Sequence, residues 1–87
     1  MQQKIRRDFG DDNAEAVVAR LNALKLANAD LQDPERIQAA VVLLSQGDMT
    51  KLEANAHLAE VDWRDVLVFS GLGNADWPAQ LETALAD

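Results

Sequence analysis

Apolar residues recur along most of this chain at the spacing of an α-helix. Val17, Leu21 and Leu24 follow one another at i, i+4 and i+7, which places their side chains on one helical face. Asp12 lies three residues before a glutamate, as in a capping box, where the two side chains bind free N–H groups of the first helical turn. The pattern predicts an amphipathic helix over residues 13–28.

The segment DPERIQAAVVLLSQG has the clearest helical pattern. Asp33 is a good N-cap, Pro34 suits the first helical position, and Gly47 suits a left-handed stop. The apolar stripe of this segment consists of Ile37, Ala40, Val41 and Leu44, widened by Val42 and Leu43. Because so wide a stripe has neighbours on several sides, the helix over residues 34–46 is expected to be the central one.

Aspartates also mark the starts of the remaining helices. After Gly47 the chain offers two caps, Asp48 or a capping box of Thr50 with Glu53. Asp62 is expected to cap a short helix over residues 63–70, and Asp76 is expected to cap the last helix. No segment alternates long enough to predict a strand. The sequence therefore predicts one all-α domain over residues 1–87, a compact bundle of four to five short helices.

The apolar run of residues 66–69 lies between the two Asp-Trp pairs. A helix that is apolar all round either lies in the centre or presents a face to a partner. Trp63 is expected to act as a staple, packing its indole ring against the core and so fixing the end of its helix there. Trp77 fits a staple and a surface anchor equally, since tryptophan is enriched at interaction hot spots.

If the fold exposes an apolar surface, the sequence predicts that Trp77 lies at its centre. This predicted protein-binding site comprises Trp77, Leu72, Leu81 and Leu85, with Arg64 as a charged member.

Charge is distributed unevenly along the 87 residues. The net charge is −7, yet residues 1–25 carry five basic and four acidic side chains, whereas residues 52–87 carry one basic and seven acidic ones. The acidic part repels phosphate backbones and favours a basic partner, with simple solubility as the competing explanation. Residues 1–10 are interpreted as a mobile basic arm.

The composition narrows the chemistry that the chain can perform. It has no cysteine, so disulfides and thiolate catalysis are excluded, and a cytoplasmic location is expected. No apolar run approaches the length of a membrane span. The sole histidine, His57, could pair only with Ser45 or Ser70, which both suit ordinary helix ends. No enzyme activity and no cofactor are therefore predicted.

Two further sites are weak matches. The stretch NADLQDPE gathers oxygen side chains but lacks the central glycine of a calcium loop, so no metal is predicted. The chain has no Asp-Ser pair, which separates it from acyl carrier proteins that hold their prosthetic arm on such a serine.

DNA binding is an alternative hypothesis. LAEVDWRDVLVF looks loosely like a helix-turn-helix, but its second helix offers only Arg64 between two aspartates. This hypothesis requires an exposed Arg64 and an ordered segment 4–7, because a recognition helix needs cations that reach phosphates. Nucleic acid is the less favoured partner.

A pattern of acidic and apolar residues over residues 36–72 resembles one in small uncharacterised bacterial all-helical proteins. In that pattern an apolar helix precedes Gly-Asp, a second helix with spaced leucines, and Asp-(Trp/Tyr)-Arg-Asp before an apolar segment. The matching residues are Gly47, Asp48, Leu52, Asp62, Trp63, Arg64 and Asp65. The resemblance implies no activity or ligand.

These observations favour a non-enzymatic, small acidic protein-binding module: an adaptor, a regulator or an immunity-type inhibitor that engages a basic partner. A helix-turn-helix regulator that binds DNA and a structural homodimer remain the alternatives. The homodimer requires Trp77 and its neighbours to be buried across a twofold axis.

Overall fold

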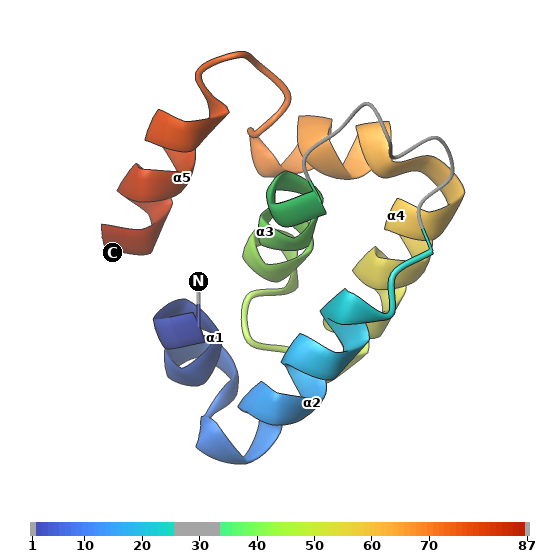
Figure 1. Ribbon diagram of the computed structural model, residues 1–87, viewed down its shortest axis with the longest axis vertical. Coiled ribbons are helices and arrows are strands. Elements are labelled where there is room, and N and C mark those ends of the chain that lie inside the picture. The colour runs from blue at the N-terminus through green and yellow to red at the C-terminus, as the bar shows by residue number, and fades with distance from the viewer. Residues whose placement is uncertain (1, 26–33, 87) are drawn as a thin grey trace.

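The computed structural model describes residues 2–25 and 34–86, and these form a bundle of helices without a strand. Figure 1 shows the helices arranged around α3. Their bounds are α1 Gln2–Phe9, α2 Asp11–Asn22, α3 Pro34–Ser45, α4 Met49–Ser70 and α5 Trp77–Ala86. The predicted all-α fold is confirmed.

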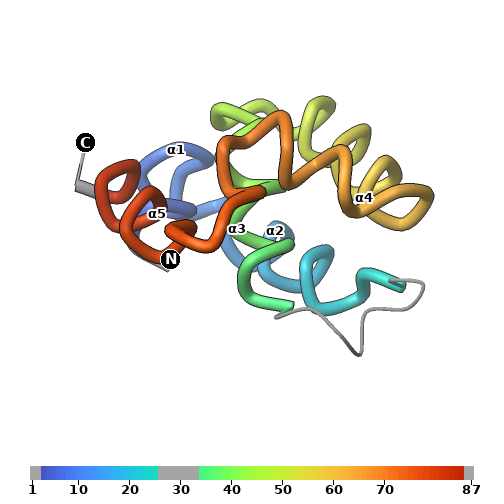
Figure 2. The backbone as a smooth tube through the Cα atoms, turned by 90° about the horizontal axis from the view of Figure 1, so that it is seen from above, coloured from blue at the N-terminus to red at the C-terminus, as the bar shows by residue number. Residues whose placement is uncertain are grey.

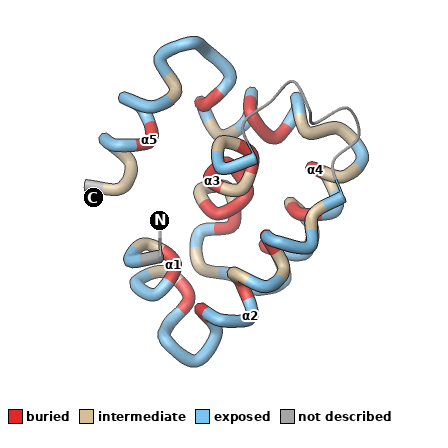
Figure 3. The backbone as a smooth tube through the Cα atoms, viewed as in Figure 1, coloured by how far each residue is buried: buried red, intermediate tan, exposed pale blue. Residues whose placement is uncertain are grey.

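Helix α3 lies at the centre of the bundle, as its wide apolar stripe predicts. Ile37 and residues 39–42 are fully buried, and α3 packs most extensively against α4. Figure 3 shows the buried residues gathered along α3 and on the sides of its neighbours that face it. The cap predicted at Asp33 lies outside the described residues.

The long helix α4 has an aspartate cap at its start, and a second aspartate divides it into two segments. Asp48 accepts hydrogen bonds from the backbone N–H groups of Thr50 and Lys51 at 2.8 and 3.1 Å, so Asp48 is the N-cap of the two candidates. Asp62 has non-helical backbone angles, φ −152° and ψ 89°, and its carboxylate accepts the N–H of Arg64 at 3.2 Å. The predicted start of a second helical segment is therefore a kink.

Helix α2 differs from its predicted form at both ends. It begins at Asp11 after Gly10, whose φ is 83° and whose carbonyl accepts the N–H of Ala14 at 3.0 Å. No side chain caps this end, so the predicted capping box at Asp12 is wrong. The helix ends at Asn22, and residues 26–28 of the predicted span lie outside the described residues.

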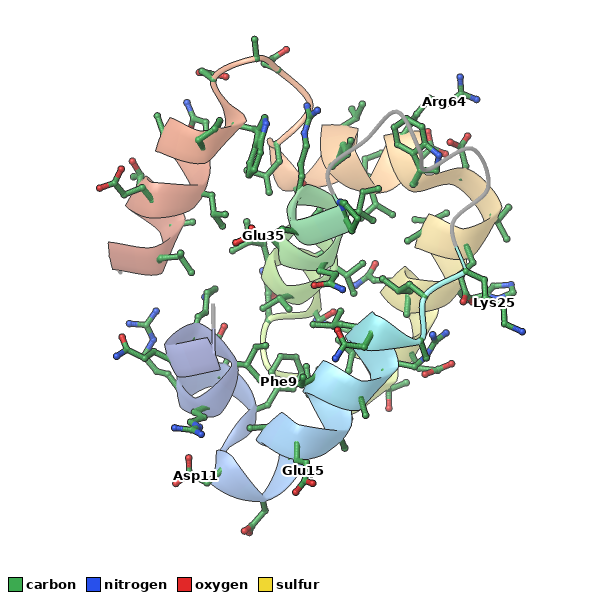
Figure 4. All side chains as sticks on the ribbon, viewed as in Figure 1. Phe9, Asp11, Glu15, Lys25, Glu35 and Arg64 are labelled. Carbon is green, nitrogen blue, oxygen red and sulfur yellow. The ribbon has the colours of Figure 1, made fainter. Side chains whose placement is uncertain are left out.

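The predicted mobile arm is wrong, because residues 2–9 form helix α1. Ile5 and Phe9, spaced i and i+4, are 2% and 6% exposed, so they anchor α1 in the core. Figure 4 shows Phe9 directed between α1 and α2 towards the interior. Lys4 pairs with Asp8 along the same helix at 2.7 Å. The basic residues of this segment are therefore the polar side of an amphipathic helix.

A close backbone approach joins α1 to the turn between α3 and α4. Gly47 has a φ of 79°, and a Cβ atom at this position would overlap the carbonyl of Asp8. Only glycine combines a left-handed backbone with so close a contact.

Helix α5 closes the bundle beside α1. Figures 1 and 2 both show α5 on the same side of the bundle as α1, and Arg7 donates a hydrogen bond to the carbonyl of Leu85 near the C-terminal end of α5 at 3.3 Å. Leu81 is buried, and Leu85 packs against the core from the next turn.

Candidate protein-binding surface

The second segment of α4, residues 63–70, presents two sides with different exposure. Val66 and Leu67 are buried, and Trp63 is half-buried against the core. The opposite side consists of Arg64, Asp65, Val68 and Phe69, which are all exposed and which we call the outward face. Positions separated by three or four residues lie together on a helix, so these four side chains form one continuous surface.

Two large apolar side chains stand in solvent on the outward face. Val68 is 68% exposed and Phe69 65%, whereas Phe9 is almost completely buried. Val61, immediately before the kink, is 69% exposed. Because a domain this small has few large side chains for its core, leaving a phenylalanine in water points to a role other than packing.

Charged groups frame these apolar residues. The Arg64 side chain is 76% exposed, its Nε lies 3.5 Å from a carboxylate oxygen of Asp62, and its guanidinium lies 5.9 Å from the centre of the Trp63 ring. Figure 4 shows Arg64 pointing away from the bundle. Among the residues that the structure describes, no cation pairs with Asp65. The outward face therefore presents a free carboxylate next to its apolar pair.

The surface predicted around Trp77 does not form. Leu72 and Leu81 are 1% and 8% exposed, so they are core residues and the prediction is wrong for them. The left-handed Gly71 turns the chain back at the end of α4, and the N–H of Leu72 bonds to the carbonyl of Leu67 at 3.0 Å. This turn directs Leu72 inward.

Trp77 and Leu85 are half-buried against the core. Arg36 covers the Trp77 ring at 5.7 Å and donates to the carbonyl of Leu72 at 2.8 Å. Of the predicted site, only Arg64 belongs to the outward face. The half-buried position of Trp63 agrees with its predicted role as a staple.

The sequence did carry a signal for the outward face. Residues 66–69 are apolar without interruption, so they show no helical period by themselves. Their flanks supply it, because Arg64 lies four residues before Val68 and Asp65 lies four residues before Phe69, and both charged residues must face water. Combining the run with its flanks would have assigned Val68 and Phe69 to the exposed side.

Two salt bridges of Arg20 tie α2 to the first segment of α4. Arg20 lies 2.9 Å from Glu53 and 3.2 Å from Glu60, and Glu60 also accepts the backbone N–H of Lys25 at 3.0 Å. The hydrogen bond from Lys25, followed by that from Arg20, lowers the pKa of Glu60. The hydrogen bond to Glu53, followed by that to Glu60, raises the pKa of Arg20. These two glutamates are thus engaged within the fold.

No hydrogen bond joins His57 to Ser45 or Ser70, whose hydroxyl groups bond to other residues. Ser45 is fully buried, donates to the carbonyl of Val41 at 2.6 Å and accepts from Asn55 at 3.3 Å. His57 is exposed on α4, and Ser70 donates to the carbonyl of Leu67. Each serine hydroxyl therefore donates a hydrogen bond to a backbone carbonyl in the last turn of its own helix.

Metal and groove sites offer less specific chemistry. Within residues 2–25 and 34–86, no three histidine or acidic side chains converge to hold a metal ion. The predicted oxygen-rich stretch lies mostly outside these residues. A groove of about 720 Å³ lies between α1 and α2, with Ile5, Ala14 and Val18 in its lining and Arg6, Asp11 and Glu15 among its charged groups. This mixture of charges indicates no particular ligand.

The two requirements for DNA binding are each met, but at separate places. Arg64 is exposed, and segment 4–7 is ordered within α1. However, Figure 4 shows Arg64 far from α1, at the opposite side of the bundle. In α1, Lys4 and Arg7 lie 2.7 and 4.0 Å from Asp8. The predicted turn coincides with the kink at Asp62, where non-helical backbone angles separate the two segments of α4.

Comparison of the chain with protein-family models, curated proteins and solved structures gives no match. In the part of the chain that the structure describes, no helix combines the length and apolar character needed to cross a membrane.

Proposed function

We propose that this chain is a non-enzymatic protein-binding module of the cytoplasm, a small acidic adaptor, regulator or immunity-type inhibitor. Its docking surface is the outward face of α4, and its partner is a basic protein. The observation that supports this proposal most is the exposure of Val68 and Phe69 on a helix whose other side is firmly packed.

Exposed apolar side chains of this kind are the usual anchors of protein interfaces. Aromatic residues are enriched where binding energy concentrates, and they act best when polar neighbours surround them and exclude water. Phe69 has such neighbours in Arg64 and Asp65, which lie on the same side of the helix. An apolar anchor within a charged rim is the arrangement expected of a protein-binding surface.

Charge favours a basic protein over a nucleic acid. The chain carries a net charge of −7, and helix α1, which carries Lys4, Arg6 and Arg7, lies away from the second segment of α4 (Figure 1). A nucleic acid needs several cations on one surface to neutralise its phosphates. A basic protein instead gains from the acidic groups that are not used within the fold.

The test compares the proteins captured by three immobilised forms of the chain from lysate of its source organism. The forms are the native protein, Phe69→Ser, and Met49→Ser as a matched control, because Met49 is a 37% exposed apolar residue at the start of α4. Circular dichroism verifies that each variant is folded. A basic protein that is lost with Phe69→Ser and kept with Met49→Ser supports the proposal.

Two results would contradict it. The first is a set of captured proteins that is the same for Phe69→Ser and the native chain. The second is retention of nucleic acid without any protein that depends on Phe69, which would favour the DNA-binding alternative.

A further inference from the structure

We infer that the partner docks on the outward face with one amphipathic helix that carries lysine or arginine beside its apolar stripe, pairing with Asp65. This inference rests on the proposed function and specifies the chemistry of the partner. It concerns the partner element that contacts α4, whatever the rest of the partner contains.

The shape of the outward face favours a helix. Arg64 with Val68, and Asp65 with Phe69, form two rows of side chains spaced i and i+4 along the helix. Rows with this spacing are the ridges that interdigitate when one helix packs on another. The rows extend over about 8 Å, at roughly 1.5 Å per residue, which matches one to two turns of a partner helix.

The apolar area is that of a peptide-sized contact. Val68 and Phe69 are about two-thirds exposed, and together they present roughly 200 Å² of side chain, given the 150–250 Å² of a whole aromatic side chain. A stable interface between globular proteins buries about 800 Å² on each partner. A single helix therefore covers this patch better than a second folded copy of the chain.

The acidic residues of this surface determine which charge the partner helix should carry. Asp65 has no cation partner among the described residues, and Asp62 is paired only with Arg64 in the same turn. Arg64 is the sole basic residue of positions 52–87, against seven acidic ones. A second copy would bring the same negative charge to the interface, whereas a basic helix supplies the cation that Asp65 lacks.

The experiment uses two synthetic 14-residue helices that share one leucine stripe and differ only in their polar residues, all lysine in one and all glutamate in the other. Each is titrated into the ¹⁵N-labelled full chain while amide chemical shifts are recorded. The variants are Phe69→Ser, Asp65→Lys, and Glu82→Lys as a control of equal charge change on an exposed part of α5.

The expected result is that the lysine helix shifts amides of residues 61–70 and binds at least about tenfold more tightly than the glutamate helix. Asp65→Lys should weaken this binding at least about fivefold more than Glu82→Lys, because a nearby charge pair contributes more than distant charge. Phe69→Ser should remove the shifts at residues 61–70.

Different failures identify different errors. Equal binding of both helices at residues 61–70, still dependent on Phe69, overturns the basic partner and leaves the docking surface intact. Equal weakening by Asp65→Lys and Glu82→Lys overturns the pairing with Asp65. Binding elsewhere, unaffected by Phe69→Ser, removes this support for the proposed function itself. A dimer in solution that Phe69→Ser dissociates identifies a second copy as the occupant and overturns the inference.

Discussion

The four consecutive apolar residues of α4 should respond to alanine in two opposite ways. Val66 and Leu67 are 0% and 4% exposed, whereas Val68 and Phe69 are about two-thirds exposed. Removing a buried side chain costs the transfer energy of the deleted groups and adds the cost of the cavity left behind. Removing an exposed one costs little.

The magnitudes follow from this burial. Val66→Ala deletes two buried carbons at about 0.8 kcal/mol each and leaves a cavity, so we expect a loss of about 2 kcal/mol in the free energy of unfolding. Leu67→Ala should cost about 3 kcal/mol. For Val68→Ala, the small buried part is offset by the roughly 0.5 kcal/mol better helix propensity of alanine, which leaves a change near zero. Phe69→Ala should cost no more than about 1 kcal/mol.

Urea denaturation followed by circular dichroism at 222 nm measures these differences through the midpoint and the slope. Val66→Ala and Leu67→Ala together should lower the free energy of unfolding by about 5 kcal/mol. This is a large part of the total of roughly 4–13 kcal/mol expected for a domain of this length. The outward pair together should leave a cooperative transition close to the native one. Losses of about 2 kcal/mol for each of Val68→Ala and Phe69→Ala would show that these residues are packed and would refute the assignment of the outward face.

Four further substitutions test other parts of the fold by the same denaturation assay. Gly47→Ala should lower the free energy of unfolding by at least about 3 kcal/mol, because it adds overlap with a backbone carbonyl to the strain of a left-handed residue. Gly71→Ala is equally left-handed but lies in open space, so it should cost about 1 kcal/mol. Equal costs for the two substitutions would contradict the close approach of α1. Ile5→Ala should cost about 3 kcal/mol, whereas a mobile arm would leave stability unchanged. The lowered pKa of Glu60 stabilises the fold at neutral pH, and this contribution is lost as the pH falls below the unfolded-state pKa of about 4.3. Glu60→Gln should therefore flatten the fall in stability between about pH 5 and 3. An unchanged dependence of stability on pH would contradict this role of Glu60.

Much of the fold could be predicted because local signals and the core agree. The wide stripe of residues 34–46 identified α3 as the central helix, and Asp62 marked the kink through its capping preference. In both cases a short-range rule, apolar spacing or the satisfaction of free N–H groups, decides the local structure. The surrounding fold does not need to be known.

The errors arose where tertiary contacts decide. Segment 2–9 has only Ile5 and Phe9 as apolar residues, and two such residues among basic ones give a weak helical pattern. The structure nevertheless buries both of them in the core. The start of α2 depends on the left-handed Gly10, which displaced the predicted cap at Asp12. The burial of Ile5 and Phe9 depends on how α1 packs, whereas the start of α2 follows from the left-handed turn at Gly10.

The candidate site was misplaced for a related reason. Leu72 resembles a surface residue in a glycine-rich connection, yet the turn at Gly71 returns it to the core. Phe69 resembles a core residue in an apolar run, yet the helical period turns it outward. Burial at the end of a helix depends on the direction in which the chain continues, and the hydrophobicity of a residue does not reveal it.

Site-specific photo-crosslinking tests the central claim most directly. A benzophenone amino acid replaces Phe69 in one form of the chain and Ala54, an exposed residue on the first segment of α4, in another. After irradiation in the source organism, we expect a discrete adduct with a basic protein from position 69 and none from position 54. No protein adduct at position 69, or the same adducts from both positions, would contradict the claim that the outward face of α4 is the docking surface.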